Sequence, residues 1–450
     1  MPWAKALAKR GFKTEFIEVV TYKSLTNEVT IKDLAEGFER ALRLKNITGE
    51  FDAIVHSTGM LVVRAWLTAN RDDASRRSRL KHLVGFAPAT WGSPLAHRGR
   101  GLLGSLFKGN KERDAENAPD FLEAGDLILD GLELASRFTW DLAHADLFGP
   151  EVFYGTDSKT PYPFIFCGNK AYSGIRGLIN QDGSDGTVRF AGVSLDSVKF
   201  SVDLTKPVGH AKRVVPAVTQ GVDSPVIFAD GKNHGTILSE PSDGMVELVT
   251  KALNVGSMDD YKTWRDAATA WSKPPKTTYQ QFVIHMTDER GDPIHDYHVE
   301  LWTISGGKPK ALPFDLQMHP YEADKSFRAF HVKYDDLQSK TPLWMRVTLS
   351  SGTFLVAYRG ISNQGFPGAT DREEKDATFV DSDQQRGLDA APTELNLDLT
   401  PYRDAGIKPA LFHPFTTTLV EIVVDREPLP FGAAIARLCQ WVDLTGKLDS

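Results

Sequence analysis

The chain has 450 residues, of which 41% are hydrophobic and 25% are charged, which is the balance of a folded globular protein of two or three domains. Its net charge of -7 argues against a nucleic-acid-binding protein, and no apolar run is long enough for a transmembrane segment. The 2 cysteines, Cys167 and Cys439, are too few for a disulfide scaffold or a cysteine zinc cluster, and they fit a reducing compartment.

The first residues predict a short amphipathic helix at Trp3–Arg10, closed by Gly11, and then a strand at Phe12–Tyr22. No apolar signal-peptide core precedes them, so the sequence as it stands predicts a cytoplasmic protein.

The next 240 or so residues alternate between strand and helix patterns, which is typical of a parallel α/β sheet with helices on both faces. Helices are predicted at Asp33–Arg43, Thr58–Ala69 and Gly244–Val255. Strands are predicted at Phe51–Val55, Lys81–Ala89, Pro163–Gly168 and Ser224–Gly231. Two insertions interrupt this order, a largely helical one at about 93–159 and an irregular or strand-rich one at Val193–Val222.

The pattern changes after a helix at Asp259–Trp271. The Pro- and Lys-containing segment 272–278 predicts a linker between a first domain, 1–271, and a second domain, 279–450. Alternating apolar runs in the second domain predict an antiparallel, all-β sandwich, with a polar loop at Asp371–Gln385 and a final helix at Phe431–Leu444.

A candidate nucleophile lies where the strand Phe51–Val55 ends. Ser57 follows it directly and precedes a helix, which is the geometry of a nucleophile elbow. Gly59 supplies one of the two small residues that such a turn needs, whereas Val55 stands where glycine is usual. A serine needs a base and an orienting acid, which in this architecture come later in the chain in the order acid, then histidine.

Both partners are present in that order. Asp185 lies in a Gly-rich loop after the Pro163–Gly168 strand, and His234 follows the Ser224–Gly231 strand. Asp182 is the alternative acid, His210 is the alternative histidine, and each candidate could also be an ordinary turn residue.

Four segments resemble the lipases and esterases of the α/β-hydrolase superfamily. They are similar to the family's serine, post-strand, acid and histidine motifs, and they read VHSTGMLVVRAW (55–66), APATWGSPLA (87–96), GSDGTV (183–188) and NHGTI (233–237). The resemblance covers residues 1–256 and implies an α/β-hydrolase fold with a helical cap at about 93–159.

The resemblance also implies roles for single residues. Ser57 would be the nucleophile, His234 the base and Asp185 the acid, and the backbone N–H of Thr58 would be an oxyanion donor. No cofactor is implied. The family's second oxyanion donor follows an early strand that has no counterpart here, so we expect that the chain starts too late, in which case a signal peptide would be missing as well.

Other residues near these motifs have weaker assignments. His56 is a candidate packing or substrate-pocket residue, and Trp91 is a candidate pocket residue, although an aromatic residue after a strand more often belongs to the core. The segment DERGDPIHDYH (288–298) matches no metal-binding spacing and predicts a hairpin turn, so no metal site is expected.

The sequence therefore predicts a serine hydrolase that cleaves carboxylic esters, lipids among them, through an acyl-enzyme. Two alternatives stay open: a binding protein that keeps the fold without the missing oxyanion strand, and an acyltransferase that uses the same three residues. The ligand of the second domain is not predicted.

Overall fold

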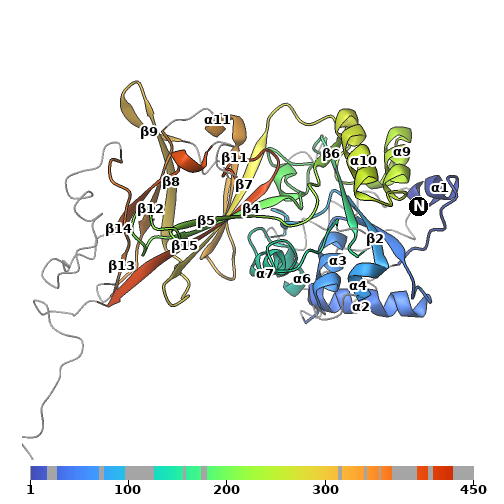
Figure 1. The fold of residues 1–450 in the computed structure, drawn as a ribbon, viewed down its shortest axis with the longest axis horizontal. Coiled ribbons are helices and arrows are strands. Elements are labelled where there is room, and N and C mark those ends of the chain that lie inside the picture. Colours follow the sequence, from blue (N-terminus) through green and yellow to red (C-terminus); the bar gives the residue numbers. More distant parts are fainter. Residues whose placement is uncertain are drawn as a thin grey trace, which may run out of the picture.

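The fold is described from a computed structural model of the chain (Figure 1). The described residues are 2–17, 28–69, 75–96, 126–155, 159–173, 180–312, 317–338, 342–353, 356–366, 393–403 and 409–428. Among these residues, no helix is both long and apolar enough to cross a membrane. The predicted loop at 371–385, the predicted final helix at 431–444 and residues 97–125 of the predicted cap lie outside them.

A parallel sheet forms the centre of the first half. Its order is β1-β2-β3-β6, and the strands are Phe51–His56, Leu80–Phe86, Tyr162–Gly168 and Val226–Ala229. Every neighbouring pair is parallel. All seven residues of β3 are buried, as expected for a strand covered on both faces.

Helices cover both faces of this sheet, α2 and α3 on one face and α1, α9 and α10 on the other (Figure 1). The ranges are Pro2–Ala8 (α1), Ile31–Leu44 (α2), Gly59–Thr68 (α3), Asp243–Ala252 (α9) and Met258–Trp271 (α10). Shorter helices are Ser75–Arg79 (α4), Asp126–Leu132 (α6), Arg137–Asp146 (α7) and Thr236–Ser239 (α8). The predicted helices of this half are thus present, with ends shifted by a few residues.

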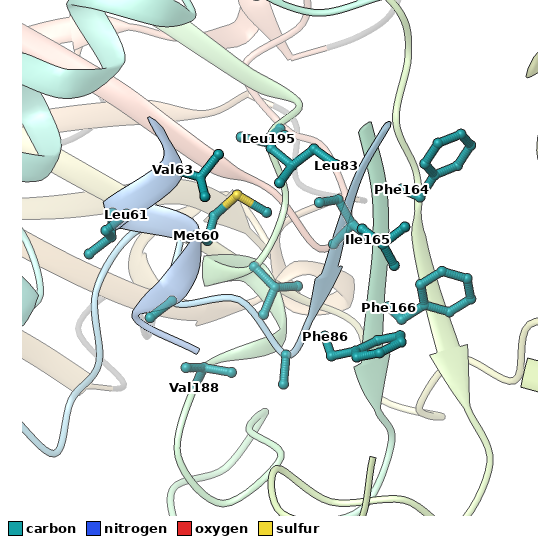
Figure 2. Packing of buried hydrophobic residues seen from close by; sticks show 14 of the residues in the cluster. Met60, Leu61, Val63, Leu83, Phe86, Phe164, Ile165, Phe166, Val188 and Leu195 are labelled. Carbon is teal, nitrogen blue, oxygen red and sulfur yellow. The ribbon is translucent and has the colours of Figure 1, made fainter. Parts of the chain in front are cut away.

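The core on the two faces is built from different side chains. Met60 of α3 lies on one side of β2 and β3, and Phe164 and Phe166 point to the other side (Figure 2). There the Phe164 ring lies 4.5 Å from that of Trp264 in α10, edge to face. The Trp3 ring of α1 stacks on Phe86 at 4.5 Å, which fixes this helix over the end of β2.

Two sheets form the second half. The larger has the order β10-β11-β7-β15-β4-β5, with β13 also paired to β15, and the smaller has the order β14-β12-β8-β9. The ranges are Ser197–Asp203 (β4), Val214–Val218 (β5), Tyr279–Asp288 (β7), Tyr297–Ser305 (β8), Lys308–Leu312 (β9), Gln317–Pro320 (β10), Phe327–Lys333 (β11), Trp344–Leu349 (β12), Val356–Arg359 (β13), Thr393–Asp398 (β14) and Thr417–Pro428 (β15), with a short helix at Tyr334–Gln338 (α11). One apolar cluster fills the space between the two sheets.

Two predictions about this half need correction. The sandwich is not purely antiparallel, because its central strand β15 runs parallel to β4 and β7 and is antiparallel only to β13. The insertion at 193–222 supplies β4 and β5, so strands from the middle of the sequence complete the sheet of the second half. The first half of β15 is buried and paired on both edges, which is the environment in which parallel strands usually occur.

The predicted strand at Phe12–Tyr22 is wrong for its described part. Residues 12–17 follow α1 without helix or strand pairing, and Phe16 is exposed. The alternating pattern suggested a strand, but the segment 12–17 pairs with no strand among the described residues.

Candidate functional site

Ser57 occupies the turn between β1 and α3. Its φ is +53°, in the left-handed region that is uncommon for residues other than glycine. Backbone hydrogen bonds hold it there: its N–H donates to the carbonyl of Phe86 at 3.2 Å, and its carbonyl accepts from Ala89 at 3.1 Å. The turn is therefore anchored to the end of β2 while the side chain is only 7% exposed.

Gly59 explains how this turn accommodates Val55. A Cβ added at Gly59 would lie 3.2 Å from the Cβ of Val55, so the missing side chain makes room for the valine. One small residue is thus enough at this crossing of strand and helix.

His234 and Asp185 form the central pair of the site. The Nδ1–H of His234 donates to Oδ2 of Asp185 at 3.0 Å, and both side chains are fully buried. The N–H of His234 also donates to the carbonyl of Asp185 at 3.1 Å. Residues 49 positions apart are in this way joined through both side chain and backbone.

Two backbone N–H groups bind the second carboxylate oxygen of Asp185. Oδ1 accepts the backbone N–H groups of Thr187 at 3.0 Å and Val188 at 2.9 Å. The structure brings Asp185 to the histidine ring, whereas Asp182 is exposed and its carbonyl accepts a hydrogen bond from His331. The alternative histidine, His210, is exposed at the β4–β5 turn.

Neighbouring residues fix the backbone around His234. Oδ1 of Asn233 accepts the N–H groups of Gly235 at 3.1 Å and Thr236 at 3.0 Å, which starts α8. His56 donates from Nε2 to the carbonyl of His234 at 2.9 Å, and the two rings are 4.6 Å apart. Burial lowers the pKa of His56 from 6.5 to about 3, so this ring is neutral near pH 7.

The remaining nitrogen of His234 is free. Nε2 is buried and has no hydrogen-bond partner in the described part of the chain, so the hydroxyl of Ser57 is not bonded to it in this state. Because Nδ1 carries the proton donated to Asp185, Nε2 has its lone pair available. The backbone N–H of Thr58, at the start of α3, likewise donates to no acceptor in the residues described.

Cys167 contacts the acid of the site, whereas Trp91 is hydrogen-bonded to the backbone of Gly192 and Ser194. Trp91 is buried, its Nε1–H donates to the carbonyl of Ser194 at 2.9 Å, and its pocket role stays a prediction. Cys167, at the end of β3, places its Sγ 3.9 Å from Oδ2 of Asp185, and burial raises the pKa of its thiol. The sequence alone did not place Cys167 beside the candidate acid. Its position at the end of a strand was the only signal that could have done so.

No metal site is found among the described residues, where no three His, Cys, Asp or Glu side chains are gathered so that they could hold an ion. The polar groups at the site are instead a hydroxyl, an imidazole and a carboxylate with backbone N–H groups around them. This set suits proton transfer to and from a serine hydroxyl.

Comparisons with known proteins identify the fold. No family model matches the sequence, and no curated protein matches it. A structure of phospholipase PlaB from Legionella pneumophila aligns with 99% of this chain and 93% of its own at 21% identity, with a TM-score of 0.70. PlaB in complex with thio-NAD aligns with 99% of this chain and 94% of its own at 19% identity, with a TM-score of 0.68. The predicted fold class, an α/β-hydrolase fold followed by a β domain, is thereby confirmed.

Proposed function

We propose that this protein is a serine hydrolase that cleaves carboxylic esters of lipids through an acyl-enzyme intermediate. The observation that carries the proposal is the pair of His234 and Asp185, with Nδ1 and Oδ2 3.0 Å apart and Nε2 free. The position of Ser57 at a φ of +53° before α3 supports it. PlaB, which has the same fold, is called a phospholipase, and this supports lipid esters as the substrate class.

The proposed reaction uses each group in turn. Ser57 attacks the ester carbonyl while Nε2 of His234 takes the hydroxyl proton. Asp185 holds the imidazole in the required tautomer and stabilises its charged form. The N–H of Thr58 donates to the oxyanion as the tetrahedral intermediate forms. His234 then gives its proton to the leaving alcohol, and a water molecule hydrolyses the acyl-enzyme by the same steps.

A fluorophosphonate probe tests the nucleophile directly. We expect the purified protein to be labelled, and the label to disappear in Ser57→Ala and to fall strongly in His234→Ala. The hydroxyl of Ser201, on β4 outside the site, provides the matched control variant Ser201→Ala, which should label like the wild type. If the wild type is not labelled, the binding-protein alternative is favoured.

The substrate class is tested with p-nitrophenyl esters of increasing acyl length and with phospholipid vesicles. Cleavage of long-chain esters and release of fatty acid from vesicles support the proposal. Cleavage of acetyl esters alone would argue for a soluble esterase. Adding a competing alcohol separates the acyltransferase alternative, because a transferase forms the new ester in preference to the free acid.

A further inference from the structure

The β domain contacts the loop that carries Asp185. We call residues 182–191 the acid loop. His331 of β11 is fully buried, and its Nε2–H donates to the carbonyl of Asp182 at 3.0 Å. The ring of His331 stacks on that of Tyr279 in β7, with centroids 4.8 Å apart and an interplanar angle of 2°. Two strands of the second half therefore present flat rings to one end of the acid loop.

Gly183 shows how closely the loop packs on these rings. Its φ is +70°, and an added Cβ would lie 2.6 Å from Nε2 of His331 and 2.7 Å from Cγ of Tyr279. Since no side chain fits at these distances, the loop backbone itself rests on the β domain at this point.

The far end of the acid loop is attached to the same sheet. Arg189 donates to Oε1 of Gln281 in β7 at 3.2 Å and to Oε1 of Gln317 in β10 at 3.4 Å. The hydroxyl of Thr417 in β15 donates to the carbonyl of Ala191 at 2.8 Å. The acid loop is thus held at both ends by strands of the larger sheet of the second half.

Two internal hydrogen bonds link the two sides of the acid loop. The N–H of Phe190 donates to the carbonyl of Gly183 at 2.8 Å, and that of Asp185 donates to the carbonyl of Val188 at 3.1 Å. A shift at Asp182 is therefore passed to the carboxylate of Asp185 three residues later. Displacements of about 1 Å in such a group can lower a catalytic rate by about a hundredfold.

We propose that His331 is a positioning residue for the reaction: its hydrogen bond to Asp182 and its stacked ring hold the acid loop so that Asp185 meets His234. This makes the β domain a part of the catalytic apparatus. The proposal rests on the proposed function, because it takes Asp185 to be the acid behind His234.

Three full-length variants test it. His331→Leu removes the donor and the flat ring, and we expect kcat for the best ester to fall by about tenfold or more while KM stays within about twofold. His331→Gln keeps an N–H donor at a similar reach and should recover most of the loss. His285→Leu is the matched control, because His285 of β7 stacks on Phe327 at 3.9 Å and does not contact the acid loop. Its kcat should stay within about twofold of wild type.

Amide hydrogen exchange gives a second measurement that does not need activity. Peptides covering 182–191 should exchange faster in His331→Leu than in the wild type, and no faster in His285→Leu. If the wild type cleaves no ester, the proposed function fails, and the exchange result still decides whether His331 holds the loop. Unchanged kcat in His331→Leu, an equal loss in His285→Leu, no recovery in His331→Gln, or unchanged exchange at 182–191 would each overturn the proposal.

Discussion

Arg64 of α3 and Asp146 of α7 form a bidentate ion pair in which both side chains are fully buried. Nε lies 2.8 Å from Oδ2, and Nη2 lies 2.9 Å from Oδ1. Nη1 donates to the carbonyl of Thr90, and the hydroxyl of Tyr154 donates to Oδ2 of Asp146. The pair therefore ties the helix behind Ser57 to α7 with its polar groups satisfied.

Removing one member of this pair should destabilise the protein strongly. Asp146→Asn leaves a buried guanidinium without its counter-charge, and we expect a loss of about 3–5 kcal/mol in the free energy of unfolding. Urea unfolding measures it. Asp141→Asn on the same helix breaks an exposed pair with Arg137, and it should cost no more than about 0.5 kcal/mol. Equal losses in the two variants would contradict this reading of the buried pair.

The backbone strain at Ser57 can be measured by comparing two variants that both lack the hydroxyl. Ser57→Gly adopts a φ of +53° without the Cβ strain, whereas Ser57→Ala keeps the strain that the native serine bears. We expect Ser57→Gly to be more stable than Ser57→Ala by about 1 kcal/mol, by chemical denaturation. Neither variant should hydrolyse esters. Identical stabilities would show that the turn relaxes when the hydroxyl is removed.

The close approach of strand and helix predicts a coupling between Gly59 and Val55. In Gly59→Ala the new Cβ would lie 3.2 Å from that of Val55, and we expect a loss of about 1 kcal/mol from overpacking. In a Val55→Gly background the same substitution should cost nothing, because the opposing side chain is gone. A double-mutant cycle of unfolding free energies measures the coupling, and additive effects would contradict it.

Stability should fall as the pH decreases below about 6.5. Burial lowers the pKa of His285 from 6.5 to about 4, with opposing effects from Glu421 and Asp324, so the folded state keeps this ring neutral. The unfolded chain takes up the proton first, and each such group removes up to about 1.4 kcal/mol per pH unit between its two pKa values.

His285→Phe keeps an aromatic ring against Phe327 and removes the titration. Its unfolding free energy should therefore decline less steeply between about pH 6.5 and pH 4 than that of the wild type. Parallel curves for the variant and the wild type would count against His285 as a source of the acid sensitivity.

The sequence allowed the fold of the first half to be predicted, because its strands and helices have clear local periods. The change of period at Ser57 located the β1–α3 turn, and a resemblance to lipases chose Asp185 over Asp182. His331 could not be predicted in this way, since it lies 149 residues from Asp182 and its strand pattern does not indicate which loop it contacts. The parallel pairing of β15 with β4 was missed for the same reason: alternation specifies faces, not partners.

The pairing of β4 with β15 also has a consequence for how the protein matures during synthesis. Ser197 is translated long before Thr417, its partner in the β4–β15 pairing. Thr417 also donates the hydrogen bond to Ala191, so this bond can form only after β15 has been translated. A ribosome-bound chain that lacks residues 417–428 therefore has an incomplete larger sheet, and its acid loop lacks the hydrogen bond from Thr417. The ester cleavage proposed above should therefore reach its full rate only after β15 has been added to the chain.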